Sequence, residues 1–393
     1  MYLGRHIWWQ IILTFLLRDG SRHAFDGDRN SGQLPENMRQ LCGQQWDAVR
    51  LGERLTVTCS ENAKGHASRV AVTAVARILV LMVRRLMEMR LLDSARLFGR
   101  WWLIVIDGTL QDRGRATPHG GARYRYVVEA KLVGPQGTMF SLLTEFREVY
   151  DPVRDEDCEL NAFRRLAERL HAEFPRLAIC LLLDGLYPVQ SVFDLCAAYG
   201  WKFIATHREG RQPLAWEEAV QTMRLSPTLV AKSRRAGADG LVEQTLRWTQ
   251  PVPFGRHLFQ VLFSGEISPK TATLWVWVTN FLLTHQNVHA IANQGGRARQ
   301  GIENVFNVEK NGGFGLEHAF CANTTASQNY HLMMQVAHML EQLLVNGLFR
   351  RLTRACRKVT DAKLIELLRT SLLHVRIEPA LPAFGQLRFR SSA

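Results

Sequence analysis

The sequence predicts an α/β protein built around one largely buried sheet, and three observations support this. Apolar stretches of strand length recur between residues 101 and 209, and two of them, 101–109 and 177–187, run into an Asp-Gly dipeptide. Segments of helical periodicity separate or flank these stretches. Finally, 47% apolar and 22% charged residues describe a core-forming chain, and 393 residues are enough for two or three domains.

Residues 1–98 show helical periodicity at both ends, around a polar middle rich in Gly and Asn. The apolar stretch 7–17 is followed by no small-residue cleavage site, so we expect an amphipathic helix there and not a signal peptide. Neither this stretch nor the one at 78–83 is long enough to span a bilayer. The first part of the chain is therefore expected to be a helical module.

Three strands are expected at 101–109, 123–133 and 138–149, with Gly-Pro and Gly turn signals between them and the first strand ending at Asp107-Gly108. Acidic residues then open a helix at 155–174. The apolar run at 177–187 reads as a strand buried on both faces, and a helical piece and a short strand follow it to residue 209. Three strands, helix, strand, helix, strand is the order of a ribonuclease H-like core, which is also the retroviral-integrase-like core.

Strand alternation over 210–285 interrupts this order, and helical periodicity returns from about 288. The fold class predicted is thus α/β, with a ribonuclease H-like core, a β-rich insertion and helical segments at both ends. The expected divisions are a helical, DNA-binding N-terminal module at 1–98, the first part of the core at 99–209, the insertion at 210–285, the last part of the core, which carries Glu303, at 286–345, and a helical, basic C-terminal segment at 346–393.

Two aspartates close apolar strands of the same predicted sheet. Asp107 ends the first strand and Asp184 ends the buried one. If these strands are neighbours, the two carboxylates lie side by side and can share a hard cation such as Mg²⁺. The alternative is that each Asp-Gly dipeptide is simply a turn, and this is the favoured interpretation for either aspartate taken alone.

A third acid strengthens the metal-site interpretation. Arg299, Glu303 and Lys310 are spaced so that one helical stripe would carry base, acid and base, with glycines before and after it. The alternative is a solvated helix face with a weak Arg-Glu pair.

These motifs, in this order, resemble the DDE transposases of bacterial insertion sequences, in particular the branch with a β-rich insertion in the catalytic domain. The residues concerned are Asp107 in IDGT, Asp184 in LLLDGLY, and the R-x3-E-x6-K pattern of Arg299, Glu303 and Lys310. The resemblance covers about residues 100–345. The family signature usually has a tyrosine three residues before the arginine, where this chain has Gly296.

The resemblance implies a DNA transposase that cleaves strands at transposon ends and transfers them into target DNA. Asp107, Asp184 and Glu303 would be the catalytic, metal-binding triad, and Arg299 and Lys310 would contact phosphates of the transposon end. Two Mg²⁺ ions, with Mn²⁺ as a substitute, suit carboxylate ligands and in-line displacement at phosphorus. The implied partners are double-stranded terminal inverted repeats and target DNA, bound by a homodimer in the bacterial cytoplasm at the nucleoid.

Charge and cysteine content agree with this expectation. The formal net charge of +13 favours an anionic partner, and Arg297 beside Arg299, the basic helix at 67–98 and the basic stretch at 349–358 suit phosphate contacts. The seven cysteines include no C-x-x-C spacing, which fits a reducing compartment. Two alternatives remain: a catalytically inactive DNA-binding transposase remnant, and a magnesium-dependent, structure-selective DNA nuclease.

Overall fold

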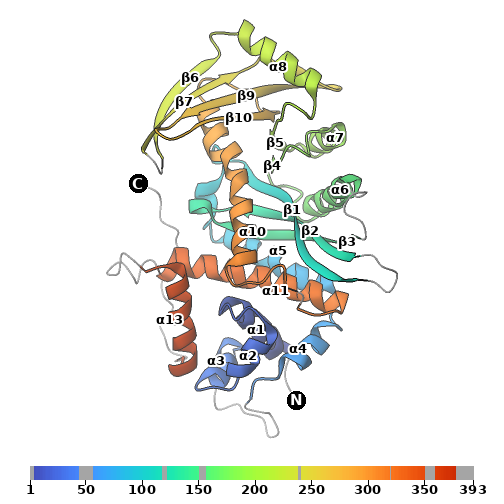
Figure 1. The fold of residues 1–393 in the computed structure, drawn as a ribbon, viewed down its shortest axis with the longest axis vertical. Helices are drawn as coiled ribbons and strands as arrows, with labels where there is room; N and C mark the ends of the chain where they lie inside the picture. The colour runs from blue at the N-terminus through green and yellow to red at the C-terminus, as the bar shows by residue number, and fades with distance from the viewer. Residues whose placement is uncertain are drawn as a thin grey trace.

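A computed structural model of the chain describes residues 4–43, 56–116, 122–149, 156–237, 240–318, 320–349 and 359–377. Within this part the strands form one mixed sheet in the order β3-β2-β1-β4-β5-β10-β9-β7-β6, with β8 paired to β9. Helices pack around the sheet, so the fold is α/β (Figure 1). Among the described helices, none combines the length and apolar character needed to cross a membrane.

Five strands make up the first half of the sheet. They are β1 (Trp102–Ala116), β2 (Ala122–Val133), β3 (Met139–Val149), β4 (Ile179–Leu183) and β5 (Lys202–Thr206). The first three form an antiparallel meander, whereas β4 and β5 run parallel to β1. Every residue of β4 is buried, which confirms the expectation of a strand covered on both faces.

β1 does not end at Asp107-Gly108, so the expected strand end was wrong. The strand continues to Ala116 and pairs with β2 on both sides of Asp107, which lies opposite Glu129. Gly108 therefore serves no turn. A Cβ at this position would collide with the hydroxyl of Tyr126, so the absence of a side chain lets the tyrosine lie against β1.

The helices between these strands are α6 (Glu156–Glu173) and α7 (Gln190–Tyr199), and α6 packs against β2 and β3. Beyond β5 come α8 (Pro213–Leu225) and the antiparallel strands β6 (Val230–Gly237), β7 (Gly240–Trp248), β8 (Val252–Phe254), β9 (His257–Ile267) and β10 (Ala272–Thr279).

The inserted strands extend the central sheet instead of forming a separate one. β10 pairs with β5 in antiparallel fashion, with Trp277 opposite Thr206. Trp277 is 2% exposed and Trp248 is 1% exposed, so both are core residues of this half of the sheet.

The segment after the insertion is not one continuous helix. It comprises α9 (Val288–Ala290), a π-helical turn (Ile291–Gly295), a 3₁₀ turn (Gly296–Gln300) and α10 (Gly301–Asn311). The expected single stripe from Arg299 to Lys310 was therefore wrong, because Arg299 lies in the 3₁₀ turn. The winding changes where the chain presses on the sheet: a Cβ at Gly295 would collide with Ile204, and one at Gly296 with Trp277.

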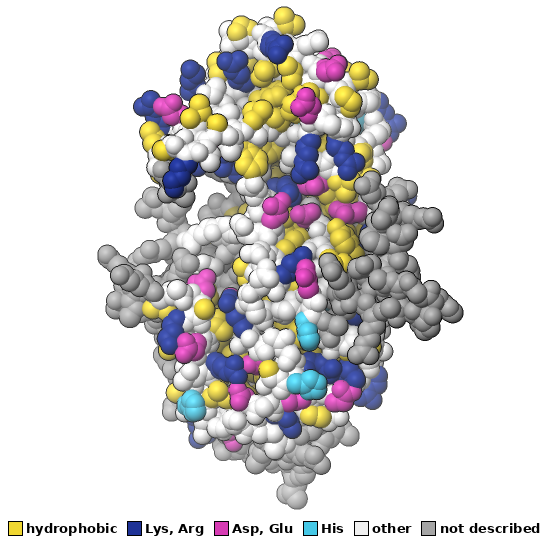
Figure 2. Space-filling model, in the orientation of Figure 1, with side chains coloured by type: hydrophobic (Ala, Val, Ile, Leu, Met, Phe, Trp, Pro, Cys, Tyr) yellow, Lys and Arg dark blue, Asp and Glu magenta, His cyan; other side chains and the backbone are white. Residues whose placement is uncertain are grey.

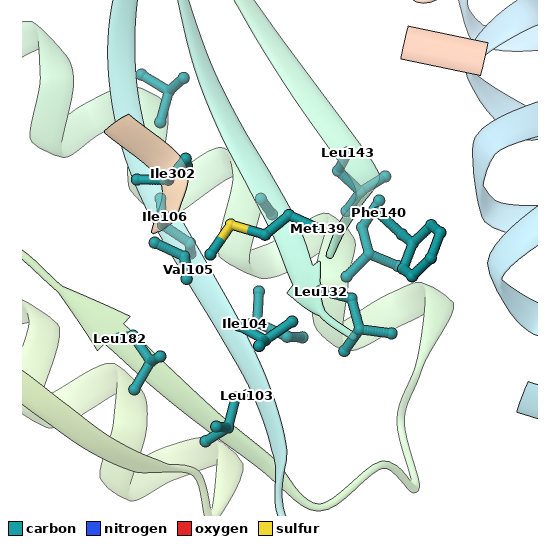
Figure 3. Packing of buried hydrophobic residues seen from close by; sticks show 14 of the residues in the cluster. Leu103, Ile104, Val105, Ile106, Leu132, Met139, Phe140, Leu143, Leu182 and Ile302 are labelled. Carbon is teal, nitrogen blue, oxygen red and sulfur yellow. The ribbon is translucent and has the colours of Figure 1, made fainter. Parts of the chain in front are cut away.

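Helix α10 lies across the face of the β1–β3 meander (Figure 1). Its Ile302 is fully buried and packs near Val105, Ile106 and Met139 in the hydrophobic core (Figure 3). Glu303 follows directly in the chain, so this apolar contact holds the start of α10, and with it the glutamate, close to β1.

The N-terminal helices are α1 (Gly4–Leu16), α2 (Arg22–Asp28), α3 (Leu34–Leu41), α4 (Ser60–Ala67) and α5 (Val72–Glu88). α1 and α4 pack against α11 (Thr324–Leu343), whereas α5 packs on β3 and α11. α13 (Asp361–His374) lies beside α3 (Figure 1). Residues 350–358, which include most of the predicted basic stretch, lie outside the described residues.

Candidate active site

The two predicted aspartates lie side by side where β4 ends, although β1 continues beyond Asp107. β1 and β4 are parallel neighbours with Val105 opposite Leu182, so two residues further along each strand Asp107 and Asp184 reach the same level. Asp184 follows β4 directly, and its carboxylate accepts a 2.7 Å hydrogen bond from the backbone N–H of Leu186. The sheet therefore holds two carboxylates side by side, as the sequence predicted.

Arg299 joins this pair to the predicted glutamate. Its Nη1 lies 3.2 Å from Oδ2 of Asp107, and its Nη2 is paired with Glu303 on the first turn of α10. The Arg299 side chain is 11% exposed, whereas that of Glu303 is 55% exposed. Glu303 thus lies on the open side of the site, and the guanidinium lies between it and Asp107.

Asp107 is held in an environment that disfavours its charge. Burial is the largest cause, and it raises the pKa of the carboxyl from 3.8 to about 6, with further upward contributions from the charges of Asp184 and Glu159. The Arg299 guanidinium and a 3.0 Å hydrogen bond from Gly108 N–H lower the pKa but do not cancel these effects. A carboxylate in this state gains from a proton or a cation beside it.

Glu159 is a member of the site that the sequence analysis missed. It lies on the first turn of α6, where its two carboxylate oxygens accept hydrogen bonds from the hydroxyls of Tyr126 at 2.9 Å and Tyr187 at 2.8 Å. The charge of Glu159 raises the pKa of both phenols, although burial is the larger cause. An acid at the start of the helix between β3 and β4 was the available signal, but it was interpreted only as a favourable helix N-terminus.

The glycine in place of the expected tyrosine has a packing explanation. A side chain at position 296 would enter the ring of Trp277 on β10. A tyrosine would therefore require a different approach of this segment to the sheet, and the close packing of Gly296 is what places Arg299 near Asp107.

The other two predicted DNA-binding residues already have acidic partners within the chain. Arg297 is paired with Glu266 of β9, which is 5% exposed, and its guanidinium lies 5.7 Å from the ring centre of Trp275. Lys310 Nζ lies 2.8 Å from Glu317 Oε1. Arg297 thus ties the 3₁₀ turn to the inserted strands, and Lys310 is partly neutralised.

The donor set suits a hard cation, although the carboxylates are not gathered around one point. Asp107 and Asp184 offer oxygen ligands of the kind that Mg²⁺ and Mn²⁺ prefer. Within the described ranges, no three His, Cys, Asp or Glu side chains are close enough together to hold a metal ion. Glu303 is directed to Arg299, so it would have to leave the guanidinium to complete a triad with the two aspartates.

Comparison with protein-family models and with curated proteins finds no match for the chain. One similar solved structure is that of NurA bound to dAMP and manganese, at 11% sequence identity over 76% of this chain and 72% of that chain, with a TM-score of 0.16. A TM-score this low transfers neither fold nor function. The function is therefore argued from the geometry of the site.

Proposed function

We propose that the chain is a metal-dependent DNA transposase with a ribonuclease H-like catalytic core. The observation that carries this proposal is that the register of the parallel strands β1 and β4 places Asp107 and Asp184 side by side, with Glu303 linked to Asp107 through Arg299. The strand order β3-β2-β1-β4-β5, antiparallel for the first three strands and parallel for the rest, supports the ribonuclease H-like core. The position of β6–β10 before Glu303 supports the branch with a β-rich insertion.

In this proposal Asp107, Asp184 and Glu303 would hold two Mg²⁺ ions, which would supply activation of the attacking oxygen and stabilisation of the leaving oxygen at phosphorus. Asp107 and Asp184 are set by the strand register, so they need little rearrangement before binding. Glu303 is paired with Arg299 and would have to leave it to bind a metal ion, which would free the guanidinium for a DNA phosphate. Water or a DNA 3′-hydroxyl is the nucleophile for cleavage and strand transfer respectively.

The proposed DNA contact near the reacting bond is inferred from the position of Arg299 at the acidic site, and not from a continuous basic surface. Lys and Arg side chains are scattered over the visible face, with Asp and Glu among them (Figure 2). The net charge of +13 supplies general attraction to DNA, which falls steeply with salt. Arg299, at the edge of the acidic site, is the basic residue best placed to contact a phosphate near the reacting bond. Two transposon ends must be brought together, for which a homodimer is proposed.

The test is incubation of the protein with labelled DNA that carries the ends of its own genomic element, in Mg²⁺ or Mn²⁺. We expect nicking at the element end and joining to target DNA, both lost in Asp107→Asn and Asp184→Asn. A drop of more than about 100-fold is expected, because a metal-binding carboxylate supplies several kcal/mol to the transition state. Asp194→Asn is the matched control. Asp194 lies on α7 and is paired with Arg256 and His257, so its loss removes a carboxylate that is not part of the proposed metal site.

The outcomes separate the alternatives. End-specific binding without cleavage would replace the proposal with an inactive DNA-binding remnant. Cleavage of DNA regardless of element ends, with no joining, would replace it with a structure-selective nuclease. Activity that survives Asp184→Asn would show that the chemistry occurs elsewhere.

A further inference from the structure

A second charged cluster lies buried beneath α10 and α11. It contains Glu129 and Lys131 on β2, Glu309 on α10, and His331, Gln335 and His338 on α11. Glu129 is fully buried. The two histidines lie at the interface of α11 with β2 and α10, where each contacts a buried glutamate. The proposed chemistry uses none of these groups.

Lys131 is the centre of the cluster. Its Nζ donates to Ser141 Oγ at 2.9 Å, to Glu309 Oε1 at 2.9 Å and to Gln335 Oε1 at 2.7 Å, and it lies 2.5 Å from Glu129 Oε2. The Lys131 side chain is 1% exposed, and those of Glu129 and Glu309 are 0% exposed. The ammonium thus joins β2, β3, α10 and α11 at one point.

The histidines divide this cluster between the sheet and α10. His338 Nδ1 lies 2.9 Å from Glu309 Oε1 on α10, whereas His331 Nε2 lies 2.6 Å from Glu129 Oε1 on β2. Both histidines come from α11, seven residues apart. They have the same chemistry and similar burial, but only His338 contacts the helix that carries Glu303.

The cluster determines which side of α10 faces the sheet. The buried residues of α10 are Ile302, Phe306 and Glu309, which share one face of the helix. Two of them are apolar, and apolar contact is non-directional. Glu309 is the charged member, and it must reach Lys131. Because each residue turns a helix by about 100°, a rotation by one position would leave Glu309 without its partners and turn Glu303 away from β1.

The strand β2 connects this buried cluster to Asp107. Glu129 lies directly opposite Asp107 in the β1–β2 ladder, so the two side chains are on the same face of the sheet. Lys131 is two residues further along β2 and also on this face. The Lys131–Glu309 contact therefore fixes the position of α10 relative to β1 and β2, the strand pair that contains Asp107.

We propose that Lys131, Glu309 and His338 are positioning residues that fix the rotation and depth of α10 and thereby direct Glu303 to Asp107 and Asp184. The inference rests on the proposed metal site for the role of Glu303. Buried ionic groups add little net stability compared with apolar residues of similar volume, but a single buried polar contact can fix the register of a helix. The position of β2, by contrast, is already fixed by backbone hydrogen bonds to β1 and β3.

The test compares His338→Phe with His331→Phe. For each variant and for the unaltered chain, the dissociation constant for Mn²⁺ alone is measured by titration calorimetry, and the free energy of unfolding by urea denaturation. Both variants lose one buried hydrogen bond, so both should be destabilised. Only His338→Phe should weaken Mn²⁺ binding, on the order of tenfold, as is typical when a residue supporting a metal ligand is lost.

A double variant keeps the proposal testable if His338→Phe does not fold. Lys131→Met with Glu309→Leu replaces one ion pair by apolar side chains, and Glu129 keeps its hydrogen bonds to His331 and Gln335. The double variant should therefore recover part of the stability lost in Lys131→Met, while Mn²⁺ binding stays weak. Stability recovered together with Mn²⁺ affinity equal to the unaltered chain would overturn the positioning role. Equal loss of Mn²⁺ affinity in His331→Phe and His338→Phe would also overturn it.

Asp184→Asn separates this inference from the proposed function. If Mn²⁺ binding by the unaltered chain is abolished in Asp184→Asn, the ion binds at the proposed site. The Mn²⁺ affinities of His338→Phe and His331→Phe then test whether the interior contacts of α10 position Glu303. If the unaltered chain does not bind Mn²⁺, or binds it equally well in Asp184→Asn, the proposed metal site is wrong and the positioning role fails with it.

Discussion

Two acidic clusters occupy the same face of the sheet. The edge cluster surrounds Asp107 where the neighbouring strand β4 ends, and the interior cluster lies beneath α10 and α11. At the edge, Asp107 has Asp184 and Glu159 nearby and Arg299 as its one close cation among the described residues, and its pKa is raised to about 6. In the interior, Glu309 has Lys131 and His338 beside it, and its pKa is lowered to about 2 although burial acts in the opposite direction. Directly opposite positions of one strand ladder, Asp107 and Glu129, thus belong to clusters of opposite character.

The difference shows that burial alone does not decide the state of a carboxylate. Burial disfavours charge in both clusters, and the number of bonded cations determines the result. In the interior cluster Glu309 is bonded to Lys131, His338 and Gln335, which suits a structural role. The edge cluster has more acid than its neighbours neutralise, which is the condition for binding an added cation.

The largest expected effect comes from removing the cation of the interior cluster. Lys131→Met leaves Glu129 and Glu309 buried without their shared partner and should lower the free energy of unfolding by about 3–5 kcal/mol, measured by urea denaturation. Lys310→Met is the matched control. Its partner Glu317 is 52% exposed, so a change within about 1 kcal/mol is expected. Similar losses in the two variants would contradict the contrast between the clusters.

The two clusters should also respond to pH with opposite sign. The raised pKa of Asp107 means that the folded state binds the proton more tightly, so its contribution to stability is present below about pH 4 and is lost as pH rises to about 6. Asp107→Asn in EDTA should remove this loss and stabilise the chain at pH 7 by about 1–3 kcal/mol.

The lowered pKa of Glu309 has the reverse consequence. Its contribution is present above about pH 4.5 and is lost as pH falls toward 2. Glu309→Gln should therefore destabilise the chain at pH 7 and change its stability less between pH 5 and pH 3 than the unaltered chain does. Unfolding free energies measured at several pH values check both variants, and a shift of the same sign in both would refute the comparison.

The smallest effect is expected for the guanidinium in the edge cluster. Arg299→Gln removes the competing cation between Asp107 and Glu303, so Mn²⁺ should bind more tightly, on the order of fivefold, as measured by calorimetry. Arg297→Gln is the matched control, because Arg297 lies in the same turn but is paired with Glu266 of β9. Weaker Mn²⁺ binding in Arg299→Gln would instead make the arginine a support for the triad.

The sequence was sufficient for features that depend on local pattern. The apolar run of β4 predicted a strand buried on both faces, and its end at Asp184 was correct. The helix at 155–174 was also correct within two residues. Continuous apolar runs and amphipathic periodicity depend on neighbours in the chain, so they can be identified without the rest of the fold.

Features that depend on distant residues were missed. The Asp107-Gly108 dipeptide has the composition of a turn, but its glycine accommodates Tyr126 from the next strand. Glu129 is buried because α11 covers its face of the strand, where it contacts His331 and Gln335. Glu159 joins the edge cluster only because two tyrosines from other elements hold it. In each case the partner is fixed by tertiary packing and not by spacing.

The pairing of β10 with β5 has a consequence for any attempt to isolate a minimal core. Because the inserted strands leave the α/β half after β5 and return beside it, the insertion looks removable from its end points alone. Its last strand, however, caps the hydrogen-bonding edge of Lys202–Thr206. A chain shortened by excision of these strands would present that edge as a template for pairing between molecules, and self-association would be the expected result.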